Sequence, residues 1–472
     1  MFAAGLPLSG VGLQAWSGSG AVLSPAPSLR SPRKDCGGDA SCSASSFEPA
    51  PFLNGTFLQL KADAAGGAGQ PGLYSRLRRL YEAVCEGAPA RFCAKVTRVC
   101  CERDLRATQR ELAMLDAARG LPGVVQLWRG GAGCPRRPRV HEFVDPASGQ
   151  LCCAIVMRLI KGVHMTPAEA RRRVFAGACD LDDVLLRWAT RIAIPVLKAL
   201  EGLHGAGIAH LDFKASNCLF SFPTATAPPL VRLIDLGFAA GFKRGESFPT
   251  VRRGSPAAMA PEVLSAFAAA TWPGVWRGAA GAAPVRPDAP DVWAAGCLLA
   301  QLLAIGIAGL PDGSASRGLL AAARRLEAYD APFAPAAMHV TAADCQARLR
   351  DIWELEHWAA GRRACSALTA LLDRLPANTA TPVLAGMLCP AMRERLSASA
   401  TLALPFLQRM HAAPRSGRAA AAAAAMKARL TRASTAVALA AGRCHQAPPE
   451  KRGWAPAFLR LHTCIGASAT VA

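Results

Sequence analysis

Gly207-Ile-Ala-His-Leu-Asp-Phe-Lys-Ala-Ser-Asn-Cys-Leu219 is followed, 23 residues after its aspartate, by the aspartate of Leu233-Ile-Asp-Leu-Gly237. The chain holds only nine Lys and three Asn among 472 residues, while Arg supplies 45 of its 54 basic side chains. Lys214 and Asn217 nevertheless both fall in the first stretch. Residue types that the composition disfavours are informative where they occur, so we take this segment as the centre of a functional site.

The side chains of these two stretches suit the transfer of a phosphoryl group from a nucleotide. That reaction needs a carboxylate to orient the attacking hydroxyl and accept its proton, a cation near the phosphate, and oxygen ligands for Mg²⁺. Asp212 is the candidate base, and Lys214 offers a compact positive charge that the planar guanidinium of Arg does not reproduce. Asn217 and Asp235 are the candidate metal ligands. The expected cofactors are therefore ATP and Mg²⁺.

The same stretches resemble the eukaryotic-type protein kinases, whose catalytic loop reads H-R-D-x-x-x-x-N and whose metal motif reads D-F-G. Further along, residues 254–262 resemble the end of an activation segment, G-T-P-x-Y-M-A-P-E, and residues 291–296 resemble D-x-W-x-x-G. The resemblance implies that Asp291 accepts backbone N–H bonds from the catalytic loop. It also implies that Glu262 pairs with a distant arginine, for which Arg395 is the candidate.

Two residues point to the Ser/Thr branch of that superfamily. Lys214 stands two residues after the predicted base, and Ser255 stands before the A-P-E motif. The resemblance implies that Ser255 bonds Asp212 and Lys214 and helps to seat the acceptor hydroxyl. The expected activity is transfer of the γ-phosphate of ATP to Ser/Thr hydroxyls of protein substrates, with Asp212, Lys214 and Ser255 as catalytic residues.

Upstream motifs supply a candidate nucleotide site. Residues 92–95, Phe-Cys-Ala-Lys, resemble V-A-I-K, and a glutamate lies 16 residues after the lysine on an expected helix. Residues 67–72 fit G-x-G-x-x-G, whose backbone N–H groups would approach the phosphates; a flexible linker is the alternative interpretation. Spacing from Lys95 and Asp212 then places Met157 at the gatekeeper position and residues 158–160 in the hinge. Cys93 and Leu219 would enclose the adenine ring. The predicted nucleotide-binding residues are Gly67, Gly69, Gly72, Cys93, Lys95, Glu111, Met157, Leu159 and Leu219.

The sequence also departs from the family pattern. Leu211 replaces the Arg of H-R-D, which removes the cation that receives an activation-loop phosphate in many kinases, and Leu236 replaces the Phe of D-F-G. Activity is therefore expected not to depend on such phosphorylation. The irregular glycine loop leaves a catalytically weak or inactive kinase-fold scaffold as the alternative. A small-molecule kinase is disfavoured because that class generally lacks the two downstream motifs.

The order of elements predicts an α+β fold with two lobes. Strand-like runs at 92–96 and 154–159 come first, and helical patterns dominate after residue 185, including a buried helix from Asp291 to Leu303. Pro195 lies inside a long amphipathic helix, where a kink or break is expected. We expect a small antiparallel β-sheet N-lobe with one main helix at about 62–160 and a larger helical C-lobe at about 161–411. Residues 1–61 are expected to form a disordered low-complexity tail, and 412–472 a basic Ala-rich tail.

Composition limits the partners and the compartment. The net charge is +21, but the basic residues are scattered and few aromatics lie among them, so nucleic-acid binding is not favoured and acidic protein substrates remain an option. Gln301 and three glycines interrupt the longest apolar run, so no membrane span is predicted. The 17 cysteines lack zinc spacing, and several lie in apolar runs, which indicates buried thiols and a cytoplasmic or nuclear protein. The acid-free first 34 residues leave an organellar transit peptide as the alternative.

Overall fold

The structure is a computed structural model, and it describes residues 58–61, 78–85, 91–128, 140–144, 149–224, 227–243, 245–247, 254–255, 258–271, 285–328, 342–362 and 366–412. All of them lie in one unit, residues 47–472. The predicted glycine loop, with Gly67, Gly69 and Gly72, lies outside the described residues, as do residues 1–57 and 413–472.

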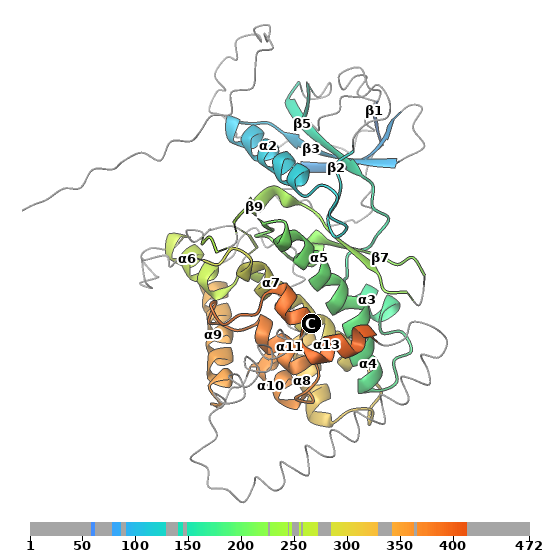
Figure 1. The fold of residues 1–472 in the computed structure, drawn as a ribbon, viewed down its shortest axis with the longest axis vertical. Helices are drawn as coiled ribbons and strands as arrows, with labels where there is room; N and C mark the ends of the chain where they lie inside the picture. Colours follow the sequence, from blue (N-terminus) through green and yellow to red (C-terminus); the bar gives the residue numbers. More distant parts are fainter. Residues whose placement is uncertain are drawn as a thin grey trace, which may run out of the picture. The chain divides into compact units, whose positions relative to one another are not determined.

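The N-terminal part is a five-stranded antiparallel sheet in the order β1-β2-β3-β5-β4 (Figure 1). Its strands are β1 Leu58–Lys61, β2 Arg78–Cys85, β3 Arg91–Arg98, β4 His141–Val144 and β5 Leu151–Arg158. β1 pairs with β2 from Leu58 opposite Cys85 to Lys61 opposite Glu82. The sheet therefore begins four residues before the domain start predicted at residue 62, within a stretch that was expected to be a disordered tail.

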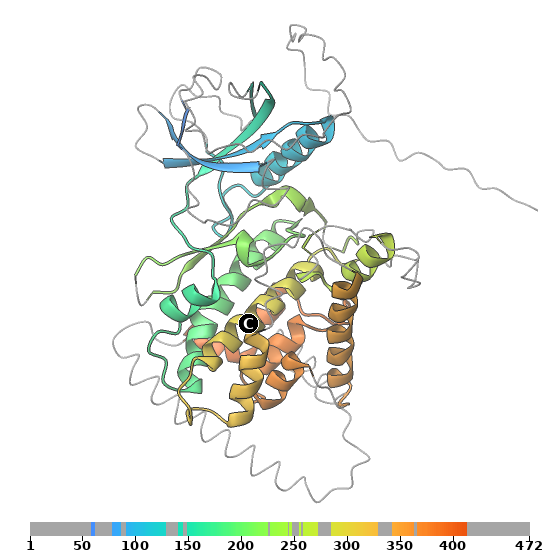
Figure 2. The ribbon, with the colours of Figure 1, turned by 180° about the vertical axis from the view of Figure 1, so that it is seen from behind.

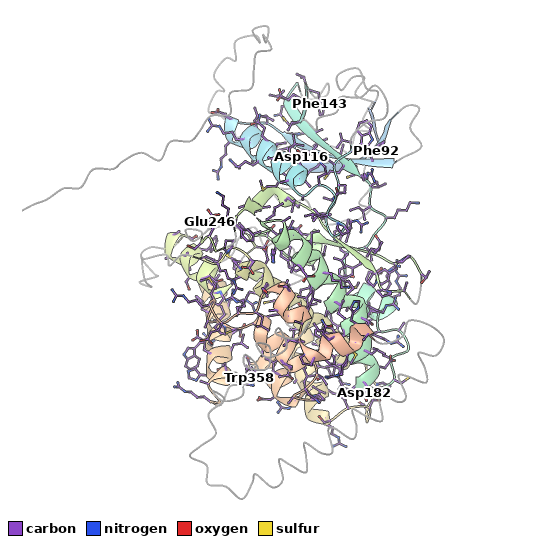
Figure 3. All side chains as sticks on the ribbon, in the orientation of Figure 1. Phe92, Asp116, Phe143, Asp182, Glu246 and Trp358 are labelled. Atoms are coloured by element: carbon purple, nitrogen blue, oxygen red, sulfur yellow. The ribbon has the colours of Figure 1, made fainter. Side chains whose placement is uncertain are left out.

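The two faces of the sheet have different partners. Phe92, Ala94 and Val96 of β3 are buried together with apolar side chains of β5, and Phe143 packs against this cluster (Figure 3). The alternate residues Cys93 and Lys95 occupy the opposite face, because successive side chains of a strand point to opposite sides. Helix α2, Glu102–Ala117, lies against that face and buries Glu111 there. The sheet thus presents Lys95 to the rest of the protein.

The C-terminal part is mostly helical and is built around α7, Ala289–Ala308. In both views the yellow to red helices lie together, apart from the blue sheet and α2 (Figure 1 and Figure 2). Nearly every residue of α7 is buried, including Asp291 and Gln301. By length and composition α7 could cross a membrane, but 94% of the tested window is buried inside the domain, as in the core helix of a globular protein. The other helices are α3 Pro167–Arg173, α4 Leu181–Trp188, α5 Ile194–Gly205, α6 Pro261–Thr271, α8 Arg317–Glu327, α9 Ala342–Ala359, α10 Ala367–Arg374, α11 Ala380–Met387, α12 Ala398–Leu402 and α13 Pro405–Ala412.

The helical stretch that contains Pro195 has a local change of winding. Between α4 and α5, residues Ala189–Ala193 form a π-helix, η1, which ends just before the proline. Proline has no N–H to donate and its ring crowds the preceding turn, so a wider turn accommodates it. The break predicted near Pro195 is therefore present as a π-turn in an otherwise continuous helix.

Short strands and turns connect the sheet to the helices. β6 Ile208–Ala209 pairs with β9 Ala240–Gly241, and β7 Cys218–Ser221 pairs with β8 Leu230–Leu233. Two 3-10 turns, η2 Ala215–Asn217 and η3 Leu236–Phe238, lie between these strands. A small antiparallel sheet with one main helix, followed by a larger helical part, confirms the predicted α+β, two-lobed fold.

Candidate active site

The loop between β6 and η2 is fixed by the buried carboxylate of Asp291. The backbone N–H groups of His210 and Leu211 donate to Asp291 Oδ2 and Oδ1 at 2.7 and 2.8 Å. Leu211 has a left-handed backbone, with φ of 60°, which turns the following residue, Asp212, toward the site. Asp291 lies in the first turn of α7, so this predicted contact ties the loop to the core helix.

His204 is a residue of this anchor that sequence reasoning missed. Its Nε2 lies 2.9 Å from Asp291 Oδ2, and only a tenth of its side chain is exposed. It comes from the last turn of α5, six residues before His210. The sequence does place this histidine in an apolar helix just before the candidate loop. A buried histidine needs a polar partner, so its position could have indicated a contact of this kind.

Asp212 lies at the centre of a compact polar cluster. Its Oδ2 accepts from Lys214 Nζ at 2.9 Å, and its Oδ1 accepts from Ser255 Oγ at 2.9 Å. Lys214 Nζ also donates to Ser255 Oγ at 2.8 Å, and Asn217 Nδ2 donates to the backbone carbonyl of Asp212 at 2.8 Å. The three predicted catalytic residues are thus in mutual contact, although Ser255 is 43 residues from Asp212 in sequence. The Asp212 side chain is 4% exposed, so its orientation is set by the protein.

Gly254 allows the segment with Ser255 to pass close to the catalytic loop. Its φ of 108° is in the region that favours glycine, and a Cβ at this position would lie 2.7 Å from the carbonyl oxygen of Leu211. A side chain here would push Ser255 away from Asp212.

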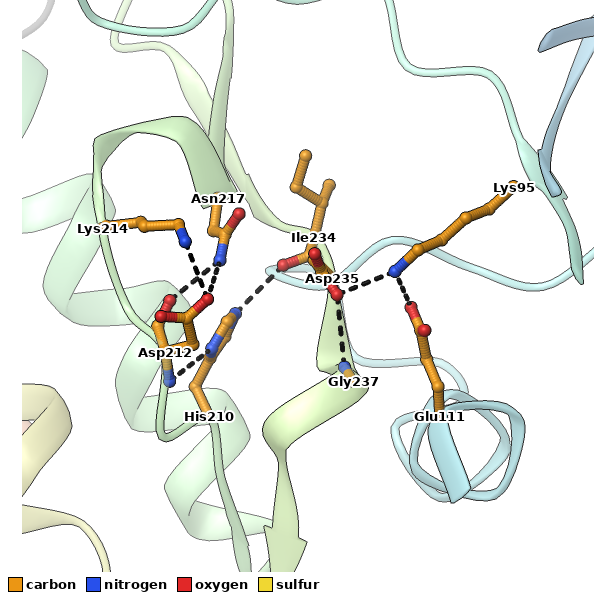
Figure 4. A network of polar contacts seen from close by, with 9 residues as sticks. All are labelled: Lys95, Glu111, His210, Asp212, Lys214, Asn217, Ile234, Asp235 and Gly237. Atoms are coloured by element: carbon orange, nitrogen blue, oxygen red, sulfur yellow. Dashed lines mark hydrogen bonds and ion pairs between the residues drawn. The ribbon is translucent and has the colours of Figure 1, made fainter. Parts of the chain in front are cut away.

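A second cluster joins the sheet, α2 and the turn before η3. Lys95 Nζ donates to Glu111 Oε1 at 2.6 Å and to Asp235 Oδ1 at 2.8 Å (Figure 4). Burial by itself lowers the pKa of Lys95, but the two carboxylates outweigh it, so the pKa lies above its ordinary value of 10.5. Asp235 has φ of 61° and its Oδ1 also accepts from Gly237 N at 3.3 Å. Lys95 is therefore a charged group held at the junction of the two parts of the fold.

The two clusters are connected through the backbone just after β8. The residue before Asp235 is Ile234, whose carbonyl oxygen lies 3.0 Å from His210 Nε2 (Figure 4). This contact sets the spacing between the turn with Asp235 and the loop with Asp212.

The remaining predicted nucleotide residues come from β3, β5, the segment after β5 and β7. Cys93 is buried on β3, two residues before Lys95 and on the same face, and Met157 is buried near the end of β5. Leu159 is half-buried in the segment that leaves β5, and Leu219 is half-buried on β7. The chain after Leu159 runs beside β7, where Val163 and Phe220 exchange backbone hydrogen bonds of 3.0 and 2.9 Å.

Asn217 and Asp235 have the donor chemistry that Mg²⁺ requires. Mg²⁺ is usually held by one or two carboxylates together with substrate phosphates, not by a cage of protein ligands. Among the described residues, no cluster of three or more His, Cys, Asp or Glu side chains is arranged for a metal. Because the amide nitrogen of Asn217 faces Asp212, its amide oxygen is left as the ligand atom. The two residues therefore fit a metal shared with phosphate oxygens.

Arg395 and Glu262 form a buried ion pair behind the site. The guanidinium donates to both carboxylate oxygens, at 2.8 and 3.0 Å, and none of the Arg395 side chain is exposed. It also donates to three carbonyl oxygens and lies over the ring of Trp293, 5.0 Å from the centroid. The pairing predicted from the motifs is present and holds the start of α6 against the loop before α12.

Comparison with known families identifies the fold. The protein kinase domain family matches residues 153–407, which is more than half of the chain. The chain belongs to the protein kinase family. The matched range holds the Asp212 and Asp235 motifs, whereas Lys95 and Glu111 lie before it and are assigned from their contacts. The predicted membership of the eukaryotic protein kinase superfamily, Ser/Thr branch, is confirmed.

Several calcium-dependent protein kinases of plants are similar to this chain. Calcium-dependent protein kinase 22 of Oryza sativa subsp. japonica is 29% identical over 203 residues, which cover 43% of this chain and 28% of the relative. Calcium-dependent protein kinase 32 of Arabidopsis thaliana is 29% identical over 36% of this chain and 26% of its own length. Calcium-dependent protein kinase 8 of the same plant is 32% identical over 28% of this chain and 22% of its own length. The kinase thus spans about a quarter of the length of the relatives it matches.

Proposed function

We propose that this kinase is catalytically active and transfers the γ-phosphate of ATP to Ser or Thr hydroxyls of protein substrates. The observation that carries the proposal is the assembled contact set of Lys95, which joins Glu111 at 2.6 Å and Asp235 at 2.8 Å. In protein kinases the ion pair between this lysine and a helix glutamate must be in place for catalysis. A scaffold that had lost activity would have no need to hold this cluster of three charges, in which Lys95 and Glu111 are largely buried.

Asp212 is the proposed base. Its carboxylate is nearly buried, and Lys214, Ser255 and Asn217 hold it, so it is ready to accept a hydrogen bond from an incoming hydroxyl. A positioned carboxylate of this kind contributes about 10²–10⁴-fold to the rate of proton transfer. Lys214 lies beside it as the cation that offsets charge on the transferred phosphoryl group.

Asn217 and Asp235 are the proposed Mg²⁺ ligands, and Lys95 is the proposed contact for the α- and β-phosphates. Mg²⁺, when bound, neutralises charge that develops on the β- and γ-phosphate oxygens. The surrounding residues orient these two ligand side chains. Asp235 is held by Lys95 and Gly237, and Asn217 is held by its hydrogen bond to the backbone of Asp212. Cys93, Met157, Leu159 and Leu219 supply the apolar surroundings expected for adenine.

Ser/Thr preference is supported by the lysine and serine beside the base. Lys214 and Ser255 bond each other at 2.8 Å and both bond Asp212, so the two residues typical of the Ser/Thr branch lie directly beside the proposed base.

The test is transfer of labelled γ-phosphate from ATP to a generic protein substrate, followed by phosphoamino-acid analysis. Asp212→Ala and Asp235→Asn are expected to abolish transfer, while Asp312→Asn, a change at an exposed aspartate, leaves it intact. Label on Ser and Thr supports the proposal. Nucleotide binding without transfer by any form would favour the inactive scaffold, and equal transfer by all forms would refute the assigned site.

A further inference from the structure

His204 is one of three N–H donors to the carboxylate that anchors the catalytic loop. Asp291 is 1% exposed, and its two oxygens accept from the backbone N–H groups of His210 and Leu211. Because an ionised carboxylate only accepts, Nε2 of His204, 2.9 Å from Oδ2, is the third donor. The described residues give Asp291 no lysine or arginine partner. A buried charge is costly unless donors compensate it, so each of the three N–H groups matters.

The ring of His204 has no second hydrogen bond in the part of the chain that the structure describes. Its Nδ1 is buried without a partner there, and the side chain is only 10% exposed. Leu200 and Leu203, which are buried in the same turns of α5, are apolar. A leucine at position 204 would pack in this setting without leaving a buried polar atom unpaired. Packing alone therefore does not account for a histidine at this position.

The loop that Asp291 anchors is strained at Leu211. The φ of this residue is 60°, which is unfavourable for a residue with a Cβ, and such a conformation persists only where surrounding contacts hold it. The N–H of Leu211 donates to Asp291 Oδ1 at 2.8 Å, so the position of this carboxylate maintains the strained turn. Asp212, the proposed base, is the next residue, and the turn sets its direction.

We propose that His204 is a positioning residue for phosphoryl transfer. Its Nε2–H fixes Asp291, and Asp291 holds the turn at Leu211 that directs Asp212 toward the acceptor hydroxyl. The expected effect on rate rests on the proposed function, whereas the effect on the loop does not. The nucleotide contact of Lys95 comes from β3, so loss of the histidine should act on turnover and not on ATP binding.

The first test compares His204→Leu, which removes the donor, with His204→Gln, whose amide nitrogen can replace Nε2. We expect His204→Leu to lower kcat by about 10–10²-fold, the effect of a small misplacement of a reacting group, with an unchanged KM for ATP. His204→Gln should recover most of this loss. His357→Leu, at a half-buried histidine that lies against Trp353 on α9, should leave kcat unchanged. Equal kcat for wild type and a folded His204→Leu protein, or an equal loss in the leucine and glutamine variants, would overturn the proposal.

Nuclear magnetic resonance separates this inference from the proposed function. In the wild-type chain the proton of the His204 ring should lie on Nε2, and the amides of His210 and Leu211 should be protected from hydrogen exchange. In His204→Leu these amides should exchange at least about tenfold faster, the equivalent of one hydrogen bond, and His204→Gln should restore their protection. If these signals are found but no form transfers phosphate, the proposed function fails and the positioning of the loop stands.

The same spectra can refute the role of His204 at any level of activity. An unprotonated Nε2 in the wild type, or unchanged exchange of the two amides in His204→Leu, would overturn the proposal. If His204→Leu does not fold, the wild-type tautomer and the amide protection in His204→Gln decide.

Discussion

Replacing Glu262 with Leu is expected to cost about 3–5 kcal/mol of unfolding free energy, because removing one partner of a buried ion pair leaves the other charge uncompensated. The charge left behind is that of Arg395, whose side chain has no exposed surface and which cannot lose its proton. Carbonyl oxygens of Ala289, Cys389 and Pro390 would still accept from the guanidinium, but they carry no counter-charge. The loss should therefore fall in the range for buried pairs, well above the value of about 0–1 kcal/mol for surface pairs.

The double variant makes this prediction quantitative. Glu262→Leu with Arg395→Met leaves no buried charge, so its cost should be smaller than the sum of the single costs, with a coupling energy of about 1–3 kcal/mol. The assay is urea unfolding at neutral pH, analysed by linear extrapolation. A matched cycle on Asp312 and Arg324, an exposed pair 3.2 Å apart, should show coupling below about 1 kcal/mol. Additive costs at Glu262 and Arg395 would refute the claim that a desolvated ion pair joins α6 to the core.

Leu211 offers no cation to an activation-loop phosphate, so phosphatase treatment should leave turnover unchanged; lost turnover would contradict this. The raised pKa of Lys95 means that its ion pairs stabilise the fold fully below about pH 10 and lose this effect as pH rises through the folded-state pKa. The stability difference between wild type and Lys95→Met should accordingly stay constant from pH 7 to 9 and shrink only above that range, as urea unfolding would measure. Burial raises the pKa of Cys153 to about 11, so native alkylation at pH 8, followed by peptide mass analysis, should label exposed Cys179 first.

Much of the active site was predictable because its residue types are rare in this chain. Lys214 and Asn217 stand out in a composition dominated by Arg and Ala, and their spacing from Asp212 matches one family. The buried helix beginning near Asp291 was predictable from its continuous apolar character, and the break before Pro195 from the missing N–H of proline. These signals are local, so a single sequence carries them.

What escaped prediction depends on tertiary contacts or on short elements. The contact between Lys95 and Asp235 joins residues 140 positions apart, and nothing in the sequence gives its length or geometry. The role of His204 depends on where α5 ends relative to α7, and β1 is recognisable only through its pairing with β2. Cysteines were also only partly predicted: six described cysteines are buried, but Cys179 and the pair before α2 are exposed.

The role of Asp212 as the base can be tested by measuring the rate of γ-phosphate transfer by Asp212→Asn at saturating ATP and Mg²⁺, together with its affinity for ADP. The substitution keeps the shape of the side chain and removes its capacity to accept a proton. We expect a kcat lower by about 10²–10⁴-fold, with ADP affinity within twofold of wild type. A kcat within twofold of wild type would contradict the assignment of Asp212 as the base of an active kinase.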